Sequence, residues 1–168
     1  MKATTLLKAQ HKKAKAALKK LTKKRDDDVL DEVASELAAH MVVEETIFYP
    51  AVMKVKPDLV MESYEEHAIA QLALKRLLDV DGDGSIFTAR AKAVFDLIDH
   101  HVEEEEEELF PKVEKAMDDD VLEALGKKMK ARFEELVDKG HAAVLPKSPA
   151  QTTADPAAAK VAVRADAA

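Results

Sequence analysis

The sequence predicts an all-α protein, folded as an up-down-up-down four-helix bundle with an additional C-terminal helix and a flexible tail. Its composition is typical of helices, because Ala, Leu, Lys, Glu and Val dominate, glycine occurs only four times and tryptophan is absent. Apolar residues recur every three to four positions almost throughout, which is the period of an amphipathic helix. Short polar connections separate four long segments of this kind, and such connections favour antiparallel neighbours.

The first two helices are expected over about residues 4–24 and 29–48. A threonine serves as the predicted N-cap of the first helix. The run Asp26–Asp28 closes the connection and places carboxylates at the N-terminus of the second helix, where the helix dipole favours negative charge. Pro50 is expected to bend or end the second helix, because proline lacks the backbone donor that a helix interior requires.

The third helix is expected to begin at Pro57, since proline suits the first helical turn, and to continue to about residue 78. A fourth helix over about residues 87–117 follows a short loop. Asp118–Asp120 opens a fifth helix, which should end at Gly140, a residue type common just after helices. These elements define a predicted domain over residues 1–140, long enough to bury a core.

Residues 141–168 are rich in Ala, Pro and Thr and have little to bury, so we interpret them as a flexible tail and a candidate contact for a protein partner. The net charge of −7 argues against nucleic acid as a partner. The lack of cysteine excludes disulfides, cysteine-ligated zinc and iron–sulfur clusters. No apolar stretch reaches membrane length, and no secretory leader is recognisable. We therefore expect a cytoplasmic location and neither a membrane partner nor export.

One segment occurs twice. Residues 40–50 align without gaps onto residues 101–111, and both read His-x-x-x-Glu-Glu-x-x-apolar-aromatic-Pro. Each copy lies on a predicted helix that follows a helix with a lone histidine, His11 in the first case and His67 in the second. The chain therefore consists of two related helix pairs, each with two histidines and one carboxylate at matching positions.

Polar residues interrupt the apolar stripe of every long helix, where they should face the core. A spacing of four residues puts His and Glu on one helix face, one above the other. All these residues fall near the middle of their helices, so one transverse layer can contain them. The candidate metal ligands are His11, His40, Glu44, His67, His101 and Glu105.

Burying two carboxylates among four imidazoles costs several kcal/mol per uncompensated ion, and bound cations remove that cost. Nitrogen-rich ligand sets suit iron better than magnesium or calcium; zinc and, less well, manganese remain open. Two bridging carboxylates favour two metal ions, about 3.5–4 Å apart. The alternative is purely structural, with the histidines as buried core residues that bind no metal.

This pattern resembles the hemerythrin-like, or HHE cation-binding, family, whose signature is H…HxxxE…H…HxxxE along a four-helix bundle. The resemblance covers about residues 4–117. It implies two non-haem irons, bridged by an oxo or hydroxo group and two carboxylates. By this resemblance, Glu44 and Glu105 would bridge the two irons. His11 and His40 would bind one iron, and His67 and His101 would bind the other.

One departure from the family concerns the third helix. Oxygen-carrying members have a second histidine four residues after the first, where this chain has Gln71. One iron then has a further exchangeable position, which argues against reversible oxygen carriage. Our leading hypothesis is a redox-active di-iron protein that turns over or senses a small oxidant (peroxide, dioxygen or nitric oxide), with peroxide dismutation first. The alternative is a non-enzymatic iron or gas sensor, or an iron reservoir, acting through a protein partner at the tail.

Two other patterns compete with this interpretation. His100 and Glu104 have the same spacing as His101 and its glutamate, but the repeat alignment and the apolar stripe both favour His101. The loop at residues 79–86 resembles the start of a calcium-binding EF-hand loop, yet its twelfth position is Arg90, a cation. We interpret that loop as a turn before the fourth helix.

The roles of four neighbouring residues are less constrained. For Tyr49 and Tyr64 core packing is favoured over contact with the metal. Glu45 and Glu106 each follow a proposed bridging glutamate. Each could orient a metal ligand through a hydrogen bond, or each could simply be a charged surface residue.

Overall fold

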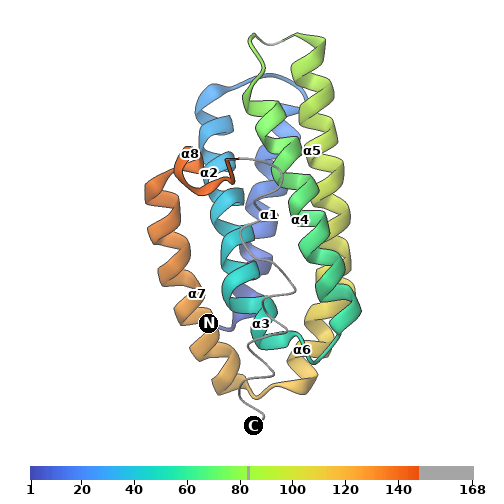
Figure 1. Cartoon of the computed structure of the whole chain (residues 1–168), viewed down its shortest axis with the longest axis vertical. Helices are drawn as coiled ribbons and strands as arrows, with labels where there is room; N and C mark the ends of the chain where they lie inside the picture. Colours follow the sequence, from blue (N-terminus) through green and yellow to red (C-terminus); the bar gives the residue numbers. More distant parts are fainter. Residues whose placement is uncertain (83, 148–168) are drawn as a thin grey trace.

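The computed structural model describes residues 1–82 and 84–147, and four long helices form its body. They are α1 (Ala3–Leu21), α2 (Asp27–Val43), α4 (Pro57–Leu78) and α5 (Ser85–Glu104). Figure 1 shows them side by side along the long axis of the molecule, joined by short connections at alternating ends. The all-α bundle predicted from the sequence is therefore confirmed.

The helix ends agree with the predicted ones in part. The Asp26 side chain accepts the backbone N–H of Val29 and so caps α2. No threonine caps α1: it begins after Lys2, and the Oγ1 of buried Thr4 instead donates to Glu114 at 2.6 Å. Thr4 is buried because the N-terminal segment packs closely against the long helix over residues 119–139, which is described next.

The predicted extra helix is α7 (Asp119–Lys139), which packs along α1 and α2 (Figure 1). Gly126 makes this close approach possible, because a Cβ there would lie only 2.4 Å from the carbonyl oxygen of Met1. Gly140 ends α7 with a φ of 73°, a conformation that favours glycine. The short helix α8 (His141–Val144) then turns back onto α2, within the segment 141–168 that the sequence predicted to be a flexible tail. The rest of that segment, residues 148–168, lies outside the described residues.

Each copy of the repeated segment contains one widened helical turn. The π-helical turns η1 (Glu44–Phe48) and η2 (Glu105–Leu109) are each followed by a short α-helix, α3 (Tyr49–Val52) and α6 (Phe110–Ala116). The second residue of each short helix is a proline, which has no N–H and crowds the carbonyl one turn earlier. The wider turn accommodates the proline without ending the helix, and it begins at the glutamate of the motif. Such turns are frequent at functional sites.

The loop before α5 is held by a cation from the protein itself. A guanidinium nitrogen of Arg25 donates to the carbonyl oxygens of Val80 and Gly82. Those carbonyls are therefore engaged, as expected of a turn rather than of a calcium loop. Asp83 lies outside the described residues.

The interior divides into two apolar clusters with a polar layer between them. One cluster contains Phe48, Tyr49 and Phe110 at the end where α3 and α6 lie, and the other contains Leu37, Phe87 and Ile98. Buried polar side chains separate the clusters: His11, His40, Glu44, Glu45, His67, Gln71, His101 and Glu105. Within the described ranges no helix is both long and apolar enough to cross a membrane.

Candidate metal centre

The four histidines of the polar layer form two pairs, each with its rings in a T-shaped arrangement. His11 of α1 meets His40 of α2, with their Nε2 atoms 3.2 Å apart. His67 of α4 meets His101 of α5 in the same way, at 3.1 Å. Two ligand atoms at about 2.1 Å from one ion and about 90° apart are separated by about 3.0 Å. Each pair is therefore spaced as two ligands of a single ion.

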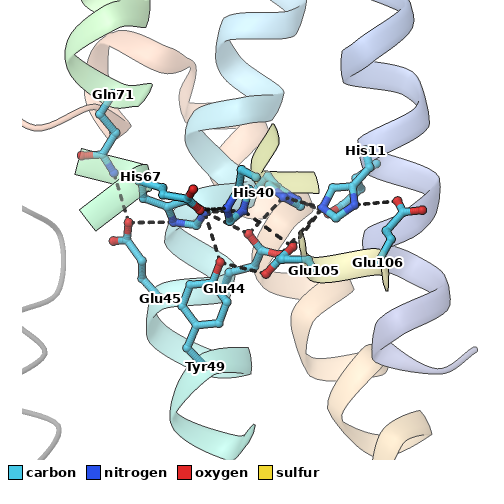
Figure 2. Close-up of polar contacts among 12 residues, drawn as sticks. His11, His40, Glu44, Glu45, Tyr49, His67, Gln71, Glu105 and Glu106 are labelled. Atoms are coloured by element: carbon cyan, nitrogen blue, oxygen red, sulfur yellow. Dashed lines mark hydrogen bonds and ion pairs between the residues drawn. The ribbon is translucent and has the colours of Figure 1, made fainter. Parts of the chain in front are cut away.

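Glu44 lies between the two pairs (Figure 2). Its Oε2 is 3.0 Å from Nε2 of His40 and 3.4 Å from Nε2 of His67. The side chain has no exposed surface. One carboxylate thus reaches a histidine of each pair.

Glu105 occupies the corresponding position on the other side of the layer. Its Oε2 is 3.4 Å from Nε2 of His11 and 3.6 Å from Nε2 of His101. It too is fully buried. The structure therefore brings all six predicted site residues together, and both glutamates span the two histidine pairs, as bridging ligands would.

The carboxylate oxygens of this layer fit a bound cation. Both oxygens of Glu44, and Oε2 of Glu105, are buried without accepting a well-aligned hydrogen bond from any residue that the structure describes. A buried carboxylate in that state is costly unless a positive charge compensates it. Carboxylate oxygens and imidazole nitrogens together suit iron or zinc. The residues present therefore fit a two-ion centre.

In the absence of metal, protons provide the compensation. Burial disfavours the charged form of His11, but Glu105 and Glu106 outweigh it and raise its pKa to about 9. Burial acts likewise on His67, where Glu44 and Glu45 raise the pKa to about 10. Metal ions at the same nitrogens would replace these protons.

Burial and neighbouring charged groups also set the pKa values of Glu44 and His40. Burial would raise the pKa of Glu44, yet the adjacent imidazoles of His40 and His67 hold it well below its ordinary value of 4.5. Burial is the main influence on His40 and lowers its pKa. Glu44 is thus ionised, and His40 is kept neutral more readily than His11 or His67; neutral imidazole is the form that binds metal.

The outward ring nitrogens of the histidines are also engaged. Nδ1 of His11 lies 2.9 Å from Glu106, and Nδ1 of His67 lies 3.1 Å from Glu45. A carboxylate at Nδ1 keeps the proton there and directs the Nε2 lone pair inward. Of the two interpretations left open for these glutamates, ligand orientation is the one that this geometry supports.

The other two partners were not predicted. Nδ1 of His40 lies 2.8 Å from Oε1 of Gln10, and Nδ1 of His101 lies 2.8 Å from Glu66. Each partner directly precedes the lone histidine of its own helix and contacts the histidine of the adjacent helix. The repeat contains this signal, because both residues occupy the same position relative to the lone histidine.

The aromatic residue of the repeat distinguishes the two halves of the site. Tyr49 Oη donates a hydrogen bond to Oε1 of Glu105 at 2.9 Å and lies 3.2 Å from Nε2 of His67. The residue is fully buried, so the phenol oxygen is placed among the candidate ligands (Figure 2). Its counterpart in the second repeat is Phe110, whose ring stacks on His11 with 5.8 Å between centroids. Core packing, the role favoured for Tyr49 from sequence, therefore does not account for its hydroxyl.

Gln71 and Tyr64 lie outside the ligand layer. Gln71 Nε2 donates to Oε1 of Glu45 at 3.2 Å, the carboxylate oxygen that also holds His67. Tyr64 donates to the backbone carbonyl of Glu45 at 2.8 Å. Gln71 thus supports a ligand without reaching the metal position, and Tyr64 has a packing role.

The structure also separates the two adjacent histidines of α5. The His101 side chain is 4% exposed, whereas that of His100 is 64% exposed. The His100 ring lies 3.7 Å from Glu66 and 3.8 Å from Glu104, outside the buried layer. The choice of His101 from the repeat alignment agrees with this placement.

Two comparisons with known proteins find the same kind of domain. The model of the hemerythrin HHE cation binding domain matches residues 2–113. A crystal structure of a hemerythrin HHE cation binding domain-containing protein from Mycobacterium kansasii is similar, with a TM-score of 0.72 and 25% sequence identity. That alignment covers 83% of this chain and 89% of the other. No curated protein matches the chain.

Proposed function

This chain belongs to the hemerythrin HHE cation-binding family, and from that premise we propose that it binds two non-haem iron ions and reacts with a small oxidant. The observation that carries the proposal is the pair of buried glutamates, each within reach of both histidine pairs. Their unpartnered oxygens call for positive charge between the pairs. Two ions sharing two carboxylates satisfy that requirement.

The ligands divide into two unequal sets. One ion is assigned to His11 and His40, and the other to His67 and His101, with Glu44 and Glu105 shared. We assign the hydroxyl oxygen of Tyr49 to the second ion, because it lies at ligand spacing from two of that ion's ligands. The first ion has only a phenyl ring at the equivalent position, so a coordination position there is left for a small molecule.

Peroxide is the oxidant that these features favour. Dismutation converts two molecules of hydrogen peroxide into two of water and one of dioxygen, and it requires no external reductant. Bound iron would supply the electron transfer. In the metal-free chain Tyr49 Oη donates its proton to Glu105, and this proton would leave when the phenol oxygen binds iron. The apolar clusters on both sides limit the access of bulk water to the layer.

The proposal is tested by growing the full chain in iron-supplemented medium and measuring iron content, visible spectrum and oxygen evolution from peroxide. We expect two irons per chain, oxo-bridge absorption that responds to peroxide, and released dioxygen. The isosteric variant Glu44→Gln should lose iron, whereas Glu107→Gln, at an exposed position in the second copy of the repeat, should retain it. A chain without iron would refute the site. Two irons without oxygen evolution would refute dismutation alone.

A further inference from the structure

A cavity of about 270 Å³ extends from the histidine layer toward α7. The four imidazoles form its floor, and its inner wall is apolar, with Leu37, Met41 and Ile98 one turn or less from the histidines. The exposed side chains of Lys13 on α1 and Lys130 on α7 also line it. The candidate site thus has a route to solvent along an apolar wall.

The volume of this cavity exceeds what a diatomic gas or hydrogen peroxide fills. An apolar cavity of about 150 Å³ is enough to bind benzene. A small oxidant alone would leave most of the apolar wall without van der Waals contacts, which is unfavourable. The cavity therefore fits a molecule with an apolar body of several carbon atoms.

One polar group in the wall is unpartnered. Oε1 of Gln10 faces Nδ1 of His40 at 2.8 Å, while its Nε2 is buried and bonded to nothing among residues 1–82 and 84–147. Nδ1 of His40 must carry the proton when Nε2 binds metal, so the amide oxygen faces the ring and the amide nitrogen faces away. A buried N–H donor without an acceptor costs about 1–3 kcal/mol. The Gln10 side chain lines the cavity, so a small shift of its amide toward an acceptor oxygen on a bound molecule would remove that cost.

We propose that this cavity binds a small organic molecule with an apolar body and one acceptor oxygen, the chemistry of a short alkyl or aryl hydroperoxide. The apolar wall would hold the body, and Gln10 Nε2 would donate to the oxygen beside the histidine floor. Phe133 of α7 also lines the cavity, and α7 lies beyond the residues matched by the family model. The hydroperoxide assignment rests on the proposed oxidant chemistry, whereas binding of the organic molecule requires no metal.

Two inert probes of matched shape test the proposal: anisole, which has an acceptor oxygen and no donor, and ethylbenzene, which has neither. Binding to the full chain is measured by calorimetry and by chemical-shift perturbation, both as purified and after removal of metal. Gln10→Glu keeps an acceptor for His40 but replaces the free donor. It should weaken anisole binding about 5–10-fold, the value of one hydrogen bond, and leave ethylbenzene binding within about twofold.

A second pair of variants checks that the probes occupy the cavity. Ala14→Leu adds atoms to its wall and should weaken both probes, whereas Ala16→Leu, exposed on the same helix, should affect neither. Failure of both probes to bind the natural chain overturns the proposal. Equal weakening of both by Gln10→Glu overturns the role of the donor. Iron content, measured on the same preparations, reports on the di-iron proposal separately.

Discussion

Replacing Tyr49 by Phe removes a single oxygen atom from the buried polar layer. That atom donates to Oε1 of Glu105 at 2.9 Å and lies 3.2 Å from Nε2 of His67. The ring itself should be accommodated, since the second repeat has Phe110 at the equivalent position. The substitution therefore isolates what the hydroxyl contributes.

The stability change follows from the type of bond that is lost. A hydrogen bond to a charged acceptor contributes about 1.5–3 kcal/mol, and no water replaces the hydroxyl next to a fully buried carboxylate. A domain of this size loses about 2–4 °C in Tm per kcal/mol, so metal-free Tyr49→Phe should melt about 3–12 °C lower. In the iron-loaded protein, loss of the phenol should also remove a phenolate-to-iron absorption band.

The assay compares thermal unfolding, iron content and visible spectrum for the natural chain and the variant. Tyr64→Phe is the matched control, because its hydroxyl donates to a backbone carbonyl outside the ligand layer. It should cost about 1 kcal/mol and leave the spectrum unchanged. If Tyr49→Phe retains both the spectrum and the melting temperature of the natural chain, the assigned role of this oxygen is wrong.

Three further predictions concern the ligands, the protons and the packing of α7. His101→Ala should lower iron content, whereas His100→Ala, one residue away and exposed, should not; equal iron in both variants would contradict the register. Because the pKa values of His11 and His67 are raised to about 9 and 10, their stabilising contribution is present below pH 6.5 and is lost as pH rises through those values. Urea unfolding of metal-free protein should therefore show several kcal/mol less stability at pH 10 than at pH 7, a loss that bound metal should reduce; an unchanged midpoint would contradict the proton compensation. Gly126→Ala should cost about 1–3 kcal/mol, because its Cβ would lie 2.4 Å from a backbone oxygen of the N-terminal segment; a neutral effect in the same assay would show that α7 is not held in this way.

The features that could be predicted from the sequence are those with a period or a repeat. Helical spacing predicted the bundle, and Asp26 and Gly140 marked helix ends by local chemistry. The alignment of the repeats through their prolines selected His101 over His100. All of these depend on patterns within the sequence itself, either a local spacing or a segment that occurs twice.

The features that could not be predicted depend on contacts between helices. Spacing places Gln10 and Glu66 on their helices, but it does not say that each reaches a histidine of the adjacent helix. Likewise, Tyr49 and Tyr64 are both buried aromatic residues near the site, and only the direction of each hydroxyl distinguishes a candidate ligand from a packing residue. Continuation of the fold past Gly140 depends on the surface of α2, where Ser35 Oγ accepts the backbone N–H of His141.

Anaerobic titration of the metal-free chain with ferrous iron tests the central claim most directly. The account predicts a sharp end point at two equivalents per chain, followed by an oxo-bridged spectrum on oxidation. With Glu44→Gln or Glu105→Gln the end point should fall, because either change removes a carboxylate that reaches both histidine pairs. An end point at zero or one equivalent in the natural chain, or two equivalents in both variants, would contradict a carboxylate-bridged two-iron centre.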